Sequence, residues 1–284
     1  MLHSIGSFPR GARVVATVVI IEHALQQVLR VPYIAHALGE RWVRAGHDVI
    51  LHRGVNPPPA DLAILHVDLT VVPEPYRAAL SRYARVVNAA AWDASKRRVS
   101  QCVLARDDPW AGPVMVKSNA NVSGRAEALI AREQRAQGLP VDVAVEASLD
   151  GYRILPSSAA VPEGDWDSPA VVVEKFVPET SAAGYHLRVW TFFGSRERSS
   201  LCTSPDPVIK SSNVSAREPV EVPPAMRAAR RRLGFDFGKF DYVLHDGRYY
   251  LLDASRTPSA PVGPSAAALA PALDEIALGL GDFL

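Results

Sequence analysis

Two aspartates in the C-terminal third of the sequence stand where a tight hairpin would bring them together. Asp241 heads one strand-like segment, Asp253 ends the next, and Asp246-Gly247 between them is typical of a hairpin turn. The two carboxylates would converge on one face of the hairpin. Magnesium is a hard cation that prefers oxygen ligands and commonly bridges carboxylates to nucleotide phosphates. The pattern indicates a metal site, although two solvated strand ends would give the same spacing.

Lys117 is a candidate phosphate ligand. It ends the apolar segment 113–117 and precedes a run of small residues, 118–124, whose backbone N–H groups would close over phosphate oxygens while the ammonium neutralises them. The alternative is an exposed lysine at a strand edge. Neither a Walker A sequence nor a Gly-x-Gly-x-x-Gly fingerprint occurs, so any nucleotide site requires a different fold.

The segment that starts at residue 170 joins an apolar strand to a mixed group of charged and apolar residues. This group consists of Glu174, Lys175, Phe176, Val177 and Glu179. Such a segment can offer backbone groups to the edge of adenine, apolar walls to its faces and a carboxylate to ribose hydroxyls. The alternative is an ordinary strand that leaves the core.

The elements that would position these residues begin with an alternating pattern. Apolar β-branched runs predict strands, and apolar residues at helical spacing predict helices between them. The predicted strands cover 13–22, 48–52, 61–67 and 86–87, and the predicted helices cover 34–45 and 76–83. Strands that alternate with helices are typical of a parallel α/β sheet, which we expect at residues 1–90.

Beyond residue 90 the pattern changes. The predicted helices cover 95–104, 125–137, 225–233 and 266–280, and the predicted strands cover 113–117, 152–155, 170–177, 186–193, 207–210, 240–244 and 249–253. The last four strands alternate apolar and polar residues, as half-buried antiparallel strands do.

In this order the segments resemble the ATP-grasp superfamily, whose members include D-alanine–D-alanine ligase, glutathione synthetase and carboxylate–amine ligases generally. The resemblance extends over about residues 95–260. It implies an α/β and α+β fold: a small parallel α/β domain at 1–90, a subdomain with a phosphate lid at 91–175, and a subdomain with a metal site at 176–284. ATP would lie between the last two, with Mg²⁺ as its metal.

The resemblance also implies residue roles. Lys96 and Lys117 would contact the phosphates or the N7 side of the purine, and Lys210 would add another phosphate-binding base. Glu174, Lys175 and Val177, with Phe176 beside them, would read adenine, and Glu179 would take the ribose.

Two arginines complete the implied catalytic set with Lys117. Arg188 resembles the arginine of the family's Asp-x-Arg-Val strand, near the γ-phosphate or the acyl group, with His186 in place of the acid. Arg256, followed by Thr-Pro-Ser, resembles the turn that meets the substrate carboxylate. Arg188 and Lys210 also fit plain surface positions.

The metal-ligand motif departs from the family's pattern. Most members end the second strand with Glu-x-Asn, whereas this chain has Asp253, Ala254 and Ser255. Aspartate reaches less far than glutamate, and a serine hydroxyl is a weaker ligand than an amide carbonyl. If Asp241, Asp253 and Ser255 hold the metal, one ion is bound loosely or another group supplies a ligand.

His66, Asp68 and Thr70 follow the predicted strand at 61–67. The carboxyl end of a parallel sheet is where α/β domains collect ligands, so these residues are candidates for the acceptor pocket. A strand-end turn with an aspartate cap is the alternative.

The resemblance implies an ATP- and magnesium-dependent ligase that joins a small-molecule carboxylate to an amine through an acyl phosphate. Two alternatives stay open. One is an ATP-grasp kinase that phosphorylates a hydroxyl group, and the other is a degenerate ATP-binding protein.

The composition of the chain argues against several classes of binding partner. A net charge of +1 lacks the basic footprint of non-specific nucleic-acid binding, and the longest apolar run is far too short to span a bilayer. The two cysteines indicate neither a disulfide framework nor a zinc site, which favours the cytoplasm. A secretory signal at the N-terminus is the weaker alternative. Exposed edge strands make a homodimer conceivable.

Overall fold

A parallel sheet of apolar strands forms the N-terminal part of the computed structural model, which describes residues 3–4, 15–144 and 151–284. The strand order is β1-β3-β2-β4-β5, and only the edge strand β1 is antiparallel to its neighbour. The strands are β1 (His3–Ser4), β2 (Thr17–Glu22), β3 (Asp48–Arg53), β4 (Leu62–Leu65) and β5 (Val86–Val87). The expected parallel α/β sheet is therefore confirmed, although residues 13 and 14 of its first predicted strand lie outside the described residues.

Helices cover both faces of this sheet. Successive side chains of β2 point to opposite faces and therefore pack in two different hydrophobic cores. Val18 and Ile20 pack against α1 (Ile34–Arg44) and α7 (Pro264–Ala277). Val19 and Ile21 pack against α2 (Glu74–Ala79) and α4 (Arg125–Ala136). A strand buried on both faces reads as an unbroken apolar run, which explains why the sequence 17–22 signals a strand so clearly.

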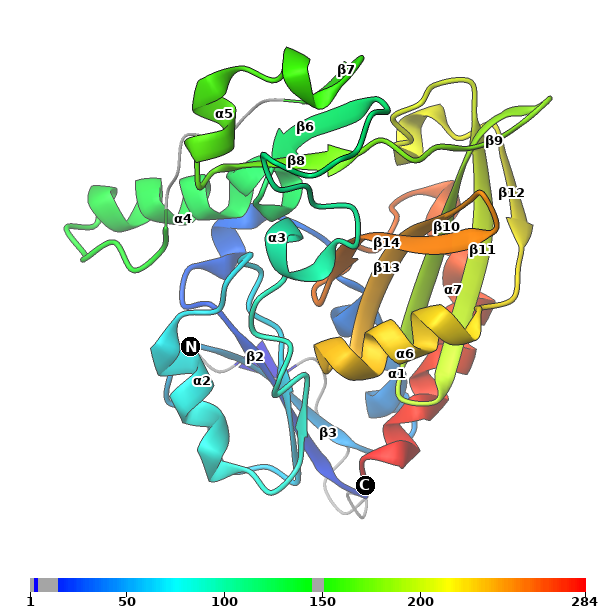
Figure 1. Cartoon of the computed structure of the whole chain (residues 1–284). Coiled ribbons are helices and arrows are strands. Elements are labelled where there is room, and N and C mark those ends of the chain that lie inside the picture. Colours follow the sequence, from blue (N-terminus) through cyan, green and yellow to red (C-terminus); the bar gives the residue numbers. More distant parts are fainter. Residues whose placement is uncertain (1–2, 5–14, 145–150) are drawn as a thin grey trace.

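The middle of the chain builds a three-stranded antiparallel sheet in the order β7-β6-β8. Its strands are β6 (Val114–Ser118), β7 (Tyr152–Leu155) and β8 (Val171–Lys175), and its neighbours include α3 (Lys96–Val99) and α5 (Glu163–Asp167). Figure 1 shows this sheet at the top of the molecule, with α4 beneath it.

The last part of the chain is a six-stranded antiparallel sheet in the order β12-β11-β10-β13-β14, with β9 paired to β10. The strands are β9 (Glu179–Ser181), β10 (Gly184–Phe193), β11 (Arg196–Ser204), β12 (Ala216–Pro219), β13 (Phe237–His245) and β14 (Arg248–Ser255). Helix α6 (Pro224–Leu233) covers one face of this sheet, where it packs against Trp190, Phe192 and Phe240 of the strands. On the other face, Phe193 and Phe237 pack in the same core as residues of α1 and α7. Figure 1 shows α6 in front of this sheet and α7 behind it.

Two predicted elements are wrong. The helix expected at 95–104 ends after one turn at Val99, because residues 100–104 run beside β8, where Leu104 N donates to Val173 O. The strand expected at 207–210 is a loop, since Pro205 and Pro207 bring no N–H group to a ladder. The strand lies upstream as β11, whose mostly polar residues hide its period.

Asn88 ties the N-terminal sheet to β13. Its φ is 66°, which places it in the left-handed region. Its side-chain oxygen accepts hydrogen bonds from Asp236 N and Phe237 N at 2.9 and 3.0 Å, and its amide donates to Phe237 O at 2.9 Å. This one buried side chain therefore satisfies three backbone groups of the C-terminal part.

Within the described residues, no helix combines the length and apolarity needed to cross a bilayer.

We expect Asn88→Ala to lower the free energy of unfolding by about 2–4 kcal/mol, because it leaves buried N–H and C=O groups unpaired and forces alanine into positive φ. Urea denaturation followed by circular dichroism measures the loss. Gln137→Ala, at the exposed end of α4, serves as the control and should change stability by less than about 0.5 kcal/mol. Equal stability of the two variants would contradict the role of Asn88.

Candidate functional site

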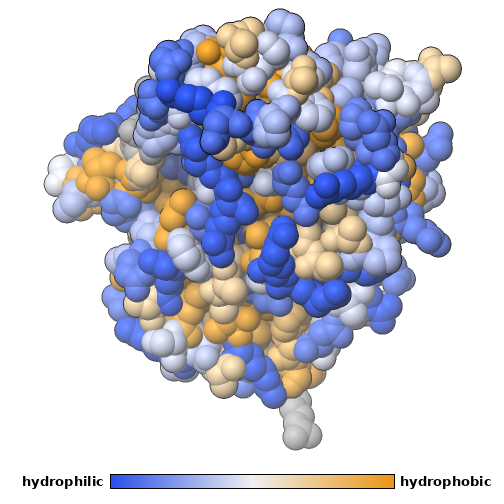
Figure 2. All heavy atoms as spheres, in the orientation of Figure 1, coloured by the Kyte–Doolittle hydropathy of each residue, from blue (hydrophilic) through white to orange (hydrophobic). Residues whose placement is uncertain are grey.

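A cavity lies between the three-stranded sheet and the six-stranded sheet. Its polar wall contains Lys96, Lys117, Glu174, Asp241 and Asp253, and its remaining wall includes Lys175, Phe176, Val177, Pro178, Glu179 and Tyr185. Nine of the sequence-predicted site residues therefore line one cavity. Figure 2, in the orientation of Figure 1, shows hydrophilic residues spread over this face of the molecule, with apolar residues exposed between them.

Asp241 and Asp253 are directly opposite each other in the register of β13 and β14. The hairpin turn between them is formed by Asp246 and Gly247, with φ of 48° and 74°, as the turn residues predicted. The register shifts after Asp241, and this bulge leaves Leu252 as an extra residue beside the two acids. The expected convergence of the two carboxylates on one face of the hairpin is confirmed.

The Asp241 carboxylate is only half satisfied. Its Oδ2 accepts a hydrogen bond from Lys239 Nζ at 2.9 Å, whereas its buried Oδ1 has no hydrogen-bond partner among the described residues. Burial raises the pKa of Asp241 and the nearby charge of Asp253 raises it further, against the opposing effect of Lys239. An unpartnered buried oxygen beside a second carboxylate fits the donor set of a hard divalent cation.

Two lysines face these acids from other elements. Lys96 Nζ, at the start of α3, lies 3.5 Å from Asp253 Oδ1 and donates to Ala120 O at 3.1 Å. Lys117 Nζ, on β6, lies 2.7 Å from Glu174 Oε2. Burial lowers the pKa of Lys117, but the carboxylates of Glu174 and Asp253 outweigh it and raise the pKa overall. Both lysines can therefore present positive charge to a polyanion in the cavity.

Part of the cavity wall is not among the residues predicted from the sequence. Tyr152 and Met115 come from β7 and β6, and the loop 207–209 adds Pro207, Val208 and Ile209. The apolar pair Val208-Ile209 does stand out in the sequence, but there it predicts a strand rather than a cavity wall. For Tyr152 no local signal exists, because only the pairing of β7 with β6 brings it opposite Lys117.

Arg188 and Lys210 do not line this cavity. Arg188 is paired with Tyr242 and Asp241 with Val189, so Arg188 and Asp241 project from opposite faces of the sheet. The Arg188 guanidinium makes a two-pronged ion pair with Glu179, with distances of 2.6 to 3.1 Å. Lys210 is exposed at the end of the loop that supplies Pro207 to Ile209.

Arg256 is buried, and its guanidinium group makes hydrogen bonds within the protein. It donates hydrogen bonds to the carbonyl oxygens of Val67, Leu69, Thr70 and Ala91. Burial lowers its pKa to about 10. In place of the implied contact with a substrate carboxylate, it cross-links the end of β14 to the loop after β4. Ser255 stands opposite Lys239, and its Oγ accepts from Thr257 N at 3.3 Å.

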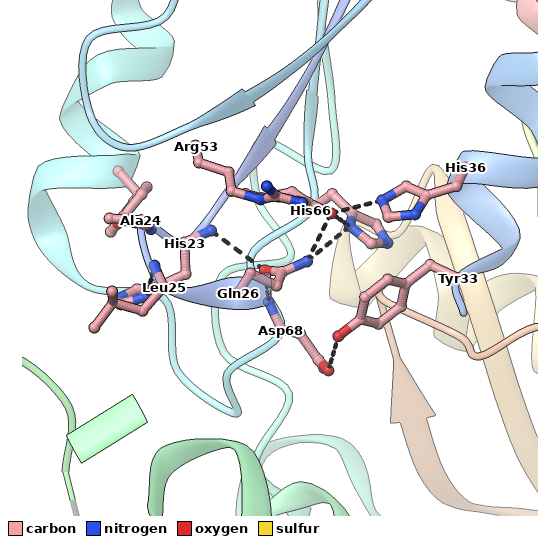
Figure 3. Close-up of polar contacts among 11 residues, drawn as sticks. His23, Ala24, Leu25, Gln26, Tyr33, His36, Arg53, His66 and Asp68 are labelled. Carbon is pink, nitrogen blue, oxygen red and sulfur yellow. Dashed lines mark hydrogen bonds and ion pairs between the residues drawn. The ribbon is translucent and has the colours of Figure 1, made fainter. Parts of the chain in front are cut away.

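His66, Asp68 and Thr70 do not share one pocket. Thr70 lines a second cavity with Ser118 and Glu127. Asp68 accepts a hydrogen bond from Tyr33 Oη at 2.6 Å (Figure 3) and one from Thr257 Oγ1 at the same distance. His66 instead lies in a cluster with Glu22 and His36.

The small-residue stretch 118–124 leaves β6 at the buried Ser118 and makes a tight, mostly half-buried turn in which Val122 is exposed. Val122 and Ser123 have φ of 46° and 54°, and Gly124 follows with φ of 71°. A β-branched residue at positive φ stores about 1–3 kcal/mol of strain, which is typical of segments that rearrange at functional sites. Residues 118–120 and 124 of this stretch line the second cavity, and the stretch directly follows Lys117, which lines the first.

No protein-family model matches this chain, and no curated protein sequence matches it either. Solved structures do match. The RimK domain ATP-grasp protein from Sphaerobacter thermophilus DSM 20745 is 12% identical with a TM-score of 0.50, and the alignment covers 93% of this chain and 99% of that one. The ATP-grasp ligase PsnB, complexed with a minimal precursor, is 12% identical with a TM-score of 0.50, covering 92% and 99%. The fold that the resemblance implies is thus confirmed: the chain has the ATP-grasp fold.

Proposed function

We propose that this protein is an ATP- and magnesium-dependent ligase that joins a carboxylate to an amine through an acyl phosphate. The observation that carries the proposal is the single cavity in which Lys96 and Lys117 stand beside the opposed carboxylates of Asp241 and Asp253. ATP, the transferred phosphoryl group and a carboxylate substrate are all anionic, so a site for them must gather cationic groups in one place.

The apolar and polar walls of the cavity would bind different parts of ATP. The apolar wall around Phe176, Val177 and Ile209 suits a purine ring, and the lysines suit its phosphates. Asp241 and Asp253 would hold magnesium, which when bound neutralises phosphate charge. Glu179 is already held by Arg188 and by Leu244 N at 2.7 Å, so its carboxylate is rigidly placed at the cavity edge.

The reaction has two steps. A carboxylate oxygen of the substrate attacks the γ-phosphorus of ATP, and ADP leaves. The amine nitrogen then attacks the acyl carbon, inorganic phosphate leaves, and the nitrogen loses a proton. The chain's own contribution is to orient the phosphates with Lys96 and Lys117, and to exclude water by closure of the loop 118–124.

Loss of one metal carboxylate should stop turnover. We expect Asp241→Asn to lower ADP release by more than about 100-fold, because it removes an anionic ligand that a neutral amide replaces poorly. The control is Asp246→Asn in the same hairpin, whose side chain is 93% exposed, and it should keep wild-type activity. ADP release by Asp241→Asn at the wild-type rate would refute the proposed metal site.

Loss of a phosphate-binding lysine should weaken ATP binding. We expect Lys117→Met to reduce ATP affinity about 10–100-fold in calorimetric titration, which is the loss of one charge-assisted hydrogen bond. It should also cost about 3–5 kcal/mol of stability, because Glu174 stays buried without its partner. Lys210→Met, outside the cavity, is the control for both measurements. Wild-type affinity in Lys117→Met would contradict the phosphate role.

The second substrate distinguishes the ligase from its alternatives. In a screen of amino acids and small carboxylic acids, we expect steady ADP release only when a carboxylate and an amine are both present. ADP release with a hydroxyl acceptor and no amine would indicate a kinase instead. Tight ATP binding without ADP release in any mixture would indicate a degenerate nucleotide-binding protein, which the serine at position 255 favours.

A further inference from the structure

Three side chains that can bind a metal converge at the carboxyl end of the N-terminal sheet. Glu22 ends β2, His36 lies in the first turn of α1, and His66 directly follows β4. One ligand atom of each lies within 4.8 Å of the others. Figure 3 shows the His36 and His66 rings close together, with the amide group of Gln26 and the side chain of Arg53 beside them. They lie outside the cavity that we assign to ATP.

The donor atoms face one common space. Glu22 Oε1 lies 2.6 Å from His36 Nε2 and 3.6 Å from His66 Nδ1. The amide nitrogen of Gln26 lies 3.0 Å from the same Glu22 oxygen and 3.4 Å from His66 Nδ1. The Gln26 amide nitrogen thus lies within reach of both the Glu22 oxygen and the His66 nitrogen, in a position where a cation would contact both.

The carboxylate of Glu22 is buried and held in a position that suits a metal ligand. Its side chain is 1% exposed, and its second oxygen, Oε2, accepts from Arg53 Nε at 3.1 Å. Arg53 therefore fixes the outer oxygen of the carboxylate, while Oε1 lies next to the histidines, as outer partners of metal ligands do.

Neighbouring groups fix the two imidazole rings and leave one approach. The Tyr33 ring contacts the His36 and His66 rings edge-on, with centroids 5.3 and 4.8 Å away, and its hydroxyl is anchored on Asp68. His66 is fully buried, whereas the His36 side chain is 29% exposed. An ion would enter on the His36 side, where an open coordination position can also take water.

We propose that Glu22, His36 and His66 form a binding site for one divalent transition-metal ion of the zinc class. Two imidazoles and one carboxylate make a donor set that suits zinc, with the fourth position open. On binding, the ion takes the place of the hydrogen bonds that Glu22 makes with His36 and Gln26, and the proton shared by Glu22 and His36 passes to solvent. This site does not depend on the proposed ligase activity.

The test is metal titration of the full chain after treatment with a chelator. Addition of Co²⁺ should produce the visible absorption of a site with nitrogen ligands, saturating at one ion per chain, and Zn²⁺ should displace it. His36→Ala and His66→Ala should each weaken Co²⁺ affinity by more than about 100-fold, since removal of a ligand costs more than removal of an outer partner. His47→Ala, a histidine outside the cluster, should bind as the wild type does.

A second control separates this site from the ATP site. Asp241→Asn should bind Co²⁺ as the wild type does, whether or not the protein proves to be a ligase. Absence of Co²⁺ and Zn²⁺ binding by the wild-type chain would overturn the proposal and leave the cluster as a metal-free ion-pair network. Wild-type affinity in His36→Ala would overturn it equally. Because His36 is partly exposed, its variant keeps the test decisive even where His66→Ala fails to fold.

Discussion

Two carboxylates of like charge face each other across the β13–β14 hairpin, and the surrounding structure balances that charge. Like charges directly opposite in a sheet are destabilising, and burial of Asp241 adds to the cost. Lys239 contacts Asp241 from the same strand, and Lys96 approaches Asp253 from α3. These ammonium groups come from different elements, so the acid pair is stable only when the three-stranded and six-stranded parts lie together.

The position of the acid pair also depends on the N-terminal sheet. Arg256, three residues after Asp253, binds carbonyl oxygens in the loop that follows β4. Asn88, directly after β5, binds the backbone at the start of β13. The hairpin is therefore anchored near both of its far ends by single buried side chains. A parallel sheet that contributes nothing to the polar wall of the cavity thus positions that wall.

Local patterns predicted the elements that carry their own signal. The apolar run of β2, the turn at Asp246-Gly247 and the alternation along β13 each depend on neighbours in sequence, and each is found. What failed depends on distant contacts. The sequence shows that Arg256 follows a strand, but its burial against four carbonyl oxygens results from the packing of two sheets. Likewise the sequence around Arg188 resembles a family motif, whereas the strand register decides which face of the sheet Arg188 occupies.

The two acid-containing clusters of this chain differ in the chemistry of their donors. Asp241 and Asp253 offer only oxygen atoms, with ammonium groups close by, and such a set suits a hard cation that shares its coordination with phosphates. Glu22 stands instead with two imidazole rings, and softer nitrogen donors suit ions of the zinc class. Because ligand type separates the two classes of ion, one chain can hold both without competition between the sites. Arg53 also helps to keep magnesium out of the Glu22 site. It donates a hydrogen bond to the outer oxygen of Glu22, so only one carboxylate oxygen is left for an ion, and magnesium needs more oxygen ligands than that.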